Sequence, residues 1–265
     1  MNKLRANGTF LVCTKFTMKL LLINPNTTQA VTEAVLTAAR ASAQQGTELK
    51  AVTGEFGAEV IGSRAENAVA HHGVLSLLAE HAPGCDAVVL AVSLDTGLWA
   101  CRELLDVPVI GMTEAGLLMG CTLAPRIGVL TYGRRMGPLY RELVESYGLG
   151  GRVAGIATLD VTPQQTFSDP HAVRQAVLAA TRQLVDRDGA EAVLFAGAAL
   201  ASMASVLQSQ IDVPLLDGIG CAVALAQARV QMPLVKARVG SVSPTGGRQS
   251  RGLSPALTDL LGGKP

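Results

Sequence analysis

Aromatic and charged side chains are scarce in this sequence. Only 3% of its 265 residues are aromatic, 16% are charged, and the formal net charge is +1. A surface that binds nucleic acid usually carries clustered lysines and arginines interleaved with aromatic residues. No stripe of this kind occurs, so we expect no nucleic-acid partner.

Long apolar runs are absent as well, although 49% of the residues are hydrophobic. A helix that crosses a bilayer needs roughly 18–20 consecutive apolar residues. No run reaches that length, and we therefore expect no membrane partner. Residues 1–17 lack the apolar core and the cleavage site of a signal peptide, and we interpret them as an N-terminal tail.

Paired cysteines and metal-ligand spacings are also missing. The five cysteines are odd in number and scattered, without a CxxC pair. This usage fits a reducing cytoplasm, where we expect the protein to reside, better than a disulfide framework. The histidines follow no metal-binding spacing, so we expect no metal site.

Small aliphatic residues and glycine dominate instead, and they recur in a repeated pattern. An apolar run at residues 87–91 ends in a polar turn at 93–97, and a second apolar run at 107–112 follows an amphipathic stretch. Two buried strands joined by a helix form the βαβ unit of a parallel sheet. The pattern returns at 191–222, where DVPLL matches the earlier DVPVI. We interpret the chain as two copies of one half-domain.

The repeat predicts an α/β fold with two pseudo-symmetric Rossmann-like halves. Each half is expected to be a parallel sheet flanked by helices, with the site in the cleft between them. We assign residues 18–113 and about 222–240 to the first half, 114–221 to the second, and 241–265 to a flexible C-terminal tail with a short turn near 257–261. The predicted strands cover residues 18–23, 47–53, 87–91, 107–112, 126–130 and 153–159. Asp169, followed by Pro170, is predicted to begin a helix.

Polar and small residues follow several of these strands. Ligands of parallel α/β sheets bind beyond the carboxyl ends of the strands. The candidate substrate-binding residues are Asn24, Asn26, Thr27, Thr96, Glu114, Thr131, Tyr132, Gly197, Ala198 and Ala199. Helix capping or turn formation is the structural alternative, above all for the two asparagines. The backbone amides of residues 197–199 are plausible oxyanion donors, because small residues let a ligand approach closely.

Four segments together resemble the aspartate/glutamate racemase superfamily, and within it the hydantoin and allantoin racemase branch. They are INPNTT at 23–28, FGAEVIGSRAE at 56–66, DTGLWACREL at 95–104 and VPVIGMTEA at 107–115. The resemblance covers roughly residues 18–230. It implies a cofactor-independent enzyme that removes and returns a proton at a carbon next to a carbonyl. In that superfamily two cysteines, one from each half, usually act as base and acid.

Both usual cysteines are missing from this sequence. The positions that the resemblance assigns to them fall at Val92 and near Gly197, and neither residue exchanges protons. Ser93 and Asp95 are the candidate catalytic residues that remain in the first turn. A serine hydroxyl is a poor base without an activating partner, whereas a single carboxylate suits a one-base mechanism. Asp95 has the alternative of bonding within its own turn.

Three hypotheses about function follow. The first is a racemase- or isomerase-like enzyme that acts, through an enolate, on a small hydantoin-like or amino-acid-derived substrate. The second keeps the enolate but makes the protein a decarboxylase or another lyase, because loss of both cysteines leaves at most one proton donor. The third is a small-molecule binder without catalysis. We also expect a homo-oligomer, because Ala- and Leu-rich helices in such folds often bury surface between subunits.

Overall fold

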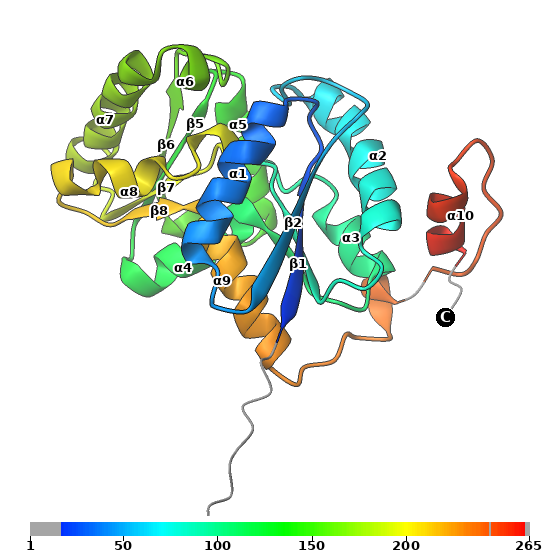
Figure 1. Cartoon of the computed structure of the whole chain (residues 1–265). Helices are drawn as coiled ribbons and strands as arrows, with labels where there is room; N and C mark the ends of the chain where they lie inside the picture. Colours follow the sequence, from blue (N-terminus) through cyan, green and yellow to red (C-terminus); the bar gives the residue numbers. More distant parts are fainter. Residues whose placement is uncertain (1–16, 244, 263–265) are drawn as a thin grey trace, which may run out of the picture.

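The computed structural model describes residues 17–243 and 245–262 and contains two four-stranded parallel sheets (Figure 1). In the first sheet the strand order is β2-β1-β3-β4. Its strands are β1 (Met18–Asn24), β2 (Thr47–Thr53), β3 (Ala87–Leu90) and β4 (Val109–Gly111). Every neighbouring pair is parallel, as the buried apolar runs predicted.

The second sheet repeats the first. Its order is β6-β5-β7-β8, which is the same order shifted by four strands. Its strands are β5 (Ile127–Tyr132), β6 (Val153–Leu159), β7 (Ala192–Phe195) and β8 (Leu215–Asp217). All pairs are again parallel. The predicted α/β fold with two similar halves is therefore confirmed.

Helices flank both sheets. They are α1 (Gln29–Ser42), α2 (Arg64–His81), α3 (Leu98–Leu104), α4 (Met112–Leu123), α5 (Met136–Ser146), α6 (Gln165–Ser168), α7 (Pro170–Asp186), α8 (Met203–Leu207), α9 (Gly218–Gln231) and α10 (Pro255–Leu261). The predicted helix start at Asp169 is confirmed, because its side chain accepts a hydrogen bond from the Ala172 amide and Pro170 opens the helix. No helix in the described ranges is long and apolar enough to cross a membrane.

Two helices are exchanged between the halves. Helix α4 follows β4 of the first sheet but packs against β7 of the second, and α9 follows β8 but packs against β3 and α1. The contact between α4 and β7 is close, since a Cβ on Gly116 would lie 2.4 Å from a methyl carbon of Leu194. The two exchanged helices also pack against each other (Figure 1). This exchange agrees with a division of the chain near residues 113 and 222, which stays a prediction.

The largest hydrophobic cluster joins both halves. It includes Leu20 and Leu22 of β1, Leu130 of β5, Phe195 of β7 and Ile219 of α9, each at most 1% exposed. Strands of a parallel sheet that is covered on both faces are expected to be apolar throughout. All four residues of β3 and of β7 are indeed buried. The halves therefore share one core and hold their strand ends in a fixed relation.

Some element boundaries differ from the sequence prediction. Thr131 and Tyr132 lie inside β5 and not in the turn after it, and β4 is shorter than the predicted 107–112 because Met112 already begins α4. The range 241–265 contains helix α10 in place of the expected short turn. Its Leu257 is 1% exposed, and the helix packs against α2. Most of the predicted N-terminal tail lies outside the described residues.

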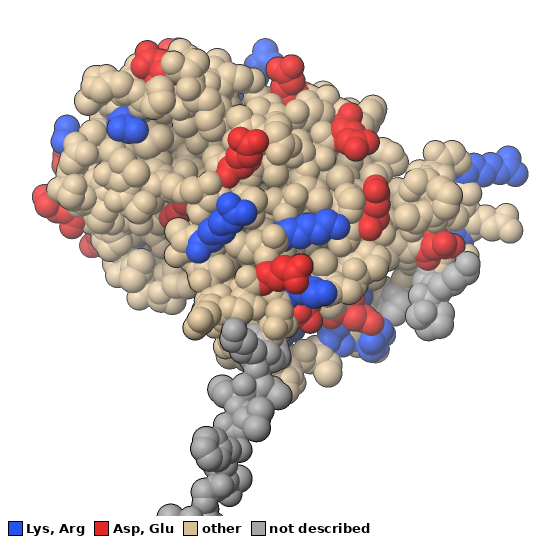
Figure 2. All heavy atoms as spheres, viewed as in Figure 1, with Lys and Arg blue, Asp and Glu red and all other residues tan. Residues whose placement is uncertain are grey.

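The surface carries mixed charge. On the face shown in Figure 2, which displays α1 and β2, acidic and basic side chains alternate over the described residues. No large field of one sign forms on this face, which agrees with the net charge of +1. Nothing on this side provides the basic stripe that nucleic-acid binding requires.

Candidate active site between the two sheets

A cavity of about 430 Å³ lies between the carboxyl ends of the two sheets. Pockets of this size hold small-molecule ligands. The first half lines it with Asn26, Val31, Val60, Ile61, Gly62, Ala91, Val92 and Ser93. The second half lines it with Thr131, Tyr132, Gly133, Arg134, Arg135, Met136, Asp160, Val161, Thr162, Pro163, Gly197, Ala198 and Ala199. Of the twelve predicted site residues, seven line this cavity: Asn26, Ser93, Thr131, Tyr132, Gly197, Ala198 and Ala199.

The turn after β3 forms part of the first wall. The Ala91 amide donates to the Ile23 carbonyl across the sheet at 2.8 Å. The chain then reverses, and the Asp95 amide donates to the Val92 carbonyl at 2.9 Å. Val92 and Ser93 lie in this reversal and line the cavity.

The turn after β7 has the same backbone pattern. The Ala196 amide donates to the Leu130 carbonyl at 2.9 Å, and the Leu200 amide donates to the Gly197 carbonyl at 2.8 Å. Val92 and Gly197 are therefore equivalent positions on opposite walls. These are the two positions at which the resemblance placed cysteines.

Each turn also carries a row of unused backbone donors. The N–H groups of residues 92–94 and of 197–199 make no hydrogen bond to another residue of the described part. Grouped N–H donors of this kind stabilise negative charge that develops on a ligand oxygen. The cavity thus offers such donors from both halves.

Gly197 and Tyr132 are fitted to each other. A Cβ on Gly197 would lie 3.0 Å from two carbons of the Tyr132 ring. The ring therefore occupies the space that a side chain at residue 197 would need. The Tyr132 hydroxyl hydrogen-bonds to the Thr166 hydroxyl, and burial raises the pKa of Tyr132 to about 12. Tyr132 therefore stays uncharged, its hydroxyl is held by Thr166, and its ring forms part of the cavity wall.

A cluster of hydroxyl groups lies beside Ser93. Tyr140 of α5 is fully buried, and its hydroxyl donates to the Ala196 carbonyl at 2.5 Å. Burial raises the Tyr140 pKa well above its usual range, whereas hydrogen bonds with Ser93, Thr131 and Thr113 oppose the rise. Tyr140 therefore stays protonated near neutral pH. The Tyr140 hydroxyl lies close to Ser93 of the first wall and to Thr131 of the second.

Asn26 and Asn24 have different roles. Asn26 lines the cavity, and its Oδ1 accepts from the Asn24 amide group and from the Thr28 backbone, both at 2.9 Å. No hydrogen bond within the described residues uses its Nδ2, which is left for a ligand. Asn24 is buried, does not line the cavity, and also donates to the Thr32 hydroxyl at 3.0 Å. Turn formation, the alternative to ligand binding, therefore accounts for the whole side chain of Asn24. It accounts for the Oδ1 atom of Asn26 but leaves the Nδ2 group of Asn26 available.

Thr27 also lies outside the cavity lining. Its backbone amide donates to the Ala58 carbonyl at 3.2 Å. The residue that caps α1 is Thr28, and its side chain makes no capping hydrogen bond. Neither Asn26 nor Thr27 is therefore the N-cap residue of this helix.

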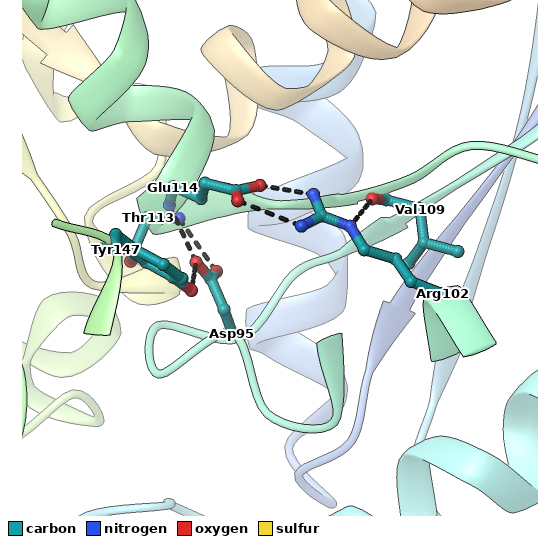
Figure 3. A network of polar contacts seen from close by, with 6 residues as sticks. All are labelled: Asp95, Arg102, Val109, Thr113, Glu114 and Tyr147. Carbon is teal, nitrogen blue, oxygen red and sulfur yellow. Dashed lines mark hydrogen bonds and ion pairs between the residues drawn. The ribbon is translucent and has the colours of Figure 1, made fainter. Parts of the chain in front are cut away.

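Asp95 is placed away from the cavity, and its carboxylate is fully occupied (Figure 3). Oδ1 accepts from the Thr113 amide at 2.9 Å, and Oδ2 accepts from the Glu114 amide at 2.8 Å and from the Tyr147 hydroxyl at 2.7 Å. Gly111 makes room for it, because a Cβ there would lie 2.4 Å from Asp95 Cγ. Asp95 caps α4. Asp95 therefore does not line this cavity, and its catalytic role stays a prediction.

The environment of Asp95 perturbs its ionisation. Burial raises its pKa to about 7, whereas the two amides at the start of α4 and the Tyr147 hydroxyl oppose the rise. Its backbone is held at φ 48°, in the left-handed region that residues other than glycine rarely adopt. This strain is maintained by the three hydrogen bonds that the side chain accepts.

Thr96 and Glu114 are not brought to the cavity either. The Thr96 hydroxyl donates to Asn67 Oδ1 at 2.6 Å. Glu114 forms a two-point ion pair with Arg102, whose Nε also donates to the Val109 carbonyl at 3.0 Å (Figure 3). Glu114 lines a separate hollow of about 360 Å³. Both residues therefore make hydrogen bonds within the first half, and neither lines the main cavity.

Several lining residues were not predicted. Most of them come from the segments after β2 and β6 and from the turn that joins β5 to α5. Arg134 and Asp160 form an exposed ion pair at 3.0 Å, and Arg135 follows directly. The rule that ligands bind beyond strand ends applies to every strand of a parallel sheet. Applied to β2 and β6 as well, it would have included these segments.

The four cysteines of the described part do not take the place of the missing pair. Cys85, Cys101, Cys121 and Cys221 are unpaired, and none lines the cavity. Burial raises the pKa of Cys101 and of Cys221 to about 12, so both stay protonated. Cys13 lies outside the described residues.

Comparisons with known proteins agree with this architecture. A family model described as Asp/Glu/Hydantoin racemase matches residues 20–226. A hydantoin racemase of Pseudomonas sp. (strain NS671) is 33% identical over 216 residues, which are 81% of this chain and 87% of that protein. The structure of allantoin racemase from Klebsiella pneumoniae superposes with a TM-score of 0.87 at 29% identity, over 91% of this chain and 99% of that one. An arylmalonate decarboxylase, at 16% identity and a TM-score of 0.56 over 82% and 94% of the chains, shares the fold alone.

Two parallel-sheet halves with a cavity between their strand ends define the class of two-domain α/β racemases. Within that class, the chain belongs to the Asp/Glu/hydantoin racemase family. It is thus a member of an enzyme family, with valine and glycine at the two equivalent turn positions.

Proposed function

We propose that the protein is a racemase- or isomerase-like enzyme that moves a proton at a carbon next to a carbonyl, without a cofactor. The proposed substrate is a small hydantoin-like or amino-acid-derived compound. One observation carries the proposal: two turns with matching pairs of backbone hydrogen bonds line one cavity, and the N–H groups of their lining residues 92–93 and 197–199 are unused within the described part. The names of the similar hydantoin and allantoin racemases support the substrate class.

The backbone donors suit an enolate. Removal of the proton next to a carbonyl places negative charge on the carbonyl oxygen. Fixed N–H groups stabilise that charge without reorganisation, and they act more strongly where water is excluded. Residues 92–93 and 197–199 supply such groups on opposite walls, which suits a flat ring held from both sides.

Ser93 is the proposed proton carrier. Its hydroxyl lies in the cluster with Tyr140, which stays protonated because burial raises its pKa. A hydroxyl of this kind protonates an enolate readily, but it is a weak base. We therefore expect proton removal to limit the rate. Val92 and Gly197 carry no ionisable group, and Asp160, the carboxylate among the lining residues, lies exposed at the rim in an ion pair with Arg134.

Decarboxylation is the second candidate, and the same absence favours it. In that reaction the bond between the carbon and its carboxylate breaks, carbon dioxide leaves, and the electron pair forms the enolate. The carbon then takes a proton from one donor. No base is required, so Ser93 and the backbone donors suffice.

Proton NMR in deuterium oxide separates these functions. Single enantiomers of allantoin and of 5-substituted hydantoins, together with an arylmalonate, are incubated with the protein and with buffer alone. Deuterium exchange above the uncatalysed rate, lost in Ser93→Ala and kept in Ser205→Ala, supports the first proposal. Carbon dioxide release from the malonate alone supports the second. A panel with neither outcome contradicts both and leaves a protein that only binds.

Two further expectations also remain proposals. We propose a cytoplasmic location, which the unpaired cysteines of the described part support. We propose a homo-oligomer, because Leu118 and Leu123 of α4 expose apolar side chains. Light scattering on the purified protein tests the oligomer, and a monomeric mass would contradict it.

A further inference from the structure

The charged residues of the cavity all come from one half. Arg134, Arg135 and Asp160 are the charged residues among those that line it, and each belongs to the second half. The lining residues of the first half are all uncharged. The cavity therefore has one neutral wall and one charged wall, although the backbones of the two halves match.

The charges of that wall do not cancel. Arg134 and Asp160 pair at 3.0 Å, and both side chains are 82% exposed. Arg135 is exposed and makes no ion pair with another residue of the described part. Because these residues line the cavity and also face solvent, they lie at its rim. The rim therefore carries a net positive charge that comes from Arg135.

The contrast with the equivalent turn of the first half is marked. After β1 the chain reads NPNTT, with Asn26 lining the cavity, whereas after β5 the turn continues through Gly133 into two arginines. Arginine binds carboxylates through charge-assisted, often two-point hydrogen bonds. An uncharged rim would suffice for a neutral ring.

We infer that Arg135 selects substrates that carry a carboxylate in addition to the reacting ring or carbonyl. The carboxylate lies at the rim of the second half, while the neutral interior beside Ser93 holds the reacting carbon. This inference rests on the proposed function only in placing the substrate in this cavity. It deepens that function by naming anionic compounds as the preferred class.

Binding measurements test the inference separately from catalysis. Dissociation constants of 5-methylhydantoin and of hydantoin-5-acetate are measured by calorimetry at low salt and at 0.5 M salt. We expect the carboxylate compound to bind about tenfold more tightly at low salt, and salt to reduce the preference because it screens exposed charges. Arg135→Gln should remove most of the preference.

Two further variants are measured: one is expected to increase the preference for the carboxylate compound, and the other is a control. Asp160→Asn frees Arg134 from its partner and should increase the preference about threefold, because it removes a negative charge from the rim. Arg141→Gln alters an exposed arginine of α5, the helix that begins directly after Arg135, and Arg141 does not line the cavity. It should leave the preference unchanged.

The outcomes separate the two proposals. A preference that neither Arg135→Gln nor Asp160→Asn changes, or no preference at all, overturns the inference, even where both compounds exchange deuterium. A preference that responds as expected while neither compound reacts supports the inference and contradicts the proposed catalysis.

Discussion

The two halves of this protein begin their exchanged helices with the same chemical group supplied from different places. In the first half, Asp95 reaches from the turn after β3 to the amides at the start of α4. In the second half, Asp217 stands at the end of β8 itself and accepts from the Ile219 and Gly220 amides at the start of α9. The comparison teaches that a pseudo-symmetric fold preserves a required interaction while the residue that provides it moves.

The arrangement in the first half has a particular requirement. Asp95 adopts a positive φ, and Gly111 stands where Asp217 stands in the second half. Any side chain at 111 would overlap the Asp95 carboxylate, because a Cβ there would be 2.4 Å from Cγ. The carboxylate in the first turn therefore serves the helix and is withheld from the cavity.

The largest expected change in stability comes from adding a side chain at residue 111, in the space that the Asp95 carboxylate occupies. Gly111→Ala should lower the free energy of unfolding by about 3–5 kcal/mol, because it displaces a buried cap and leaves the amides of α4 without a partner. Chemical denaturation measures the change. Gly151→Ala, at a position with open space around its Cβ, is the control. A loss below about 1 kcal/mol for Gly111→Ala would show that Asp95 does not depend on this contact.

The second expected effect is a pH dependence of the protein's stability. It comes from Asp95, because its pKa differs from that of an exposed carboxylate. The pKa of Asp95 in the folded protein is raised to about 7 by burial. The native state therefore keeps a proton that the unfolded chain loses between about pH 4 and 7. The stability due to this proton is complete below about pH 4 and is lost as the pH rises to about 7.

Denaturation of the wild type and of Asp95→Asn at pH 5, 6, 7 and 8 measures this dependence. Relative to the variant, the wild type should lose up to about 1.4 kcal/mol per pH unit between pH 5 and 7, and little beyond. Asp160→Asn, at an exposed carboxylate, should keep the wild-type slope. Parallel curves for the wild type and Asp95→Asn would contradict the raised pKa.

A third variant pair compares the two walls of the cavity. Gly197→Ala should lower the free energy of unfolding by about 1–3 kcal/mol, because its new Cβ presses on the Tyr132 ring at 3.0 Å. Val92→Cys, the equivalent change on the other wall, keeps a similar volume and should cost less than about 1.5 kcal/mol. Thermal denaturation measures both. Equal losses would contradict the fitted contact between Gly197 and Tyr132.

The smallest expected change in stability comes from the hydrogen bond between Tyr147 of the second half and Asp95 of the first. Tyr147→Phe removes the hydroxyl that donates to Asp95 at 2.7 Å and should lower the free energy of unfolding by about 1 kcal/mol. It should also raise the Asp95 pKa further, because one hydrogen bond to the carboxylate is lost. The midpoint of the pH dependence described above reports this shift, and a midpoint at lower pH would contradict it.

The fold was predictable from the sequence because its signals are local. The buried runs of β3 and β7 and the repeated DVP segments identify equivalent strands, and the βαβ connections make those strands parallel. The order of the strands within each sheet was not predicted. The division near residues 113 and 222 placed α4 with the second half and α9 with the first, but an amphipathic pattern does not specify the strands against which these helices pack.

The candidate site was predictable in part. Seven predicted residues line the cavity because strand ends converge there. The place of the Asp95 carboxylate at the start of α4 was not predicted, because it depends on the absence of a side chain sixteen positions away at Gly111. Arg134 and Arg135 were missed since they lie just beyond the turn in which candidates were sought. The residues at 92 and 197 were identified only through the resemblance.

The exchange of α4 and α9 has a consequence for the history of the chain. A half-length polypeptide with this order of elements would leave part of its sheet uncovered, where the exchanged helix now packs, and its last helix without a sheet. Two copies that trade their last helices satisfy both needs at once. The present chain has the architecture of a helix-swapped dimer joined into one polypeptide, so duplication and fusion of a gene for a self-associating half is the simplest origin of its cavity. Once fused, the two walls were free to diverge.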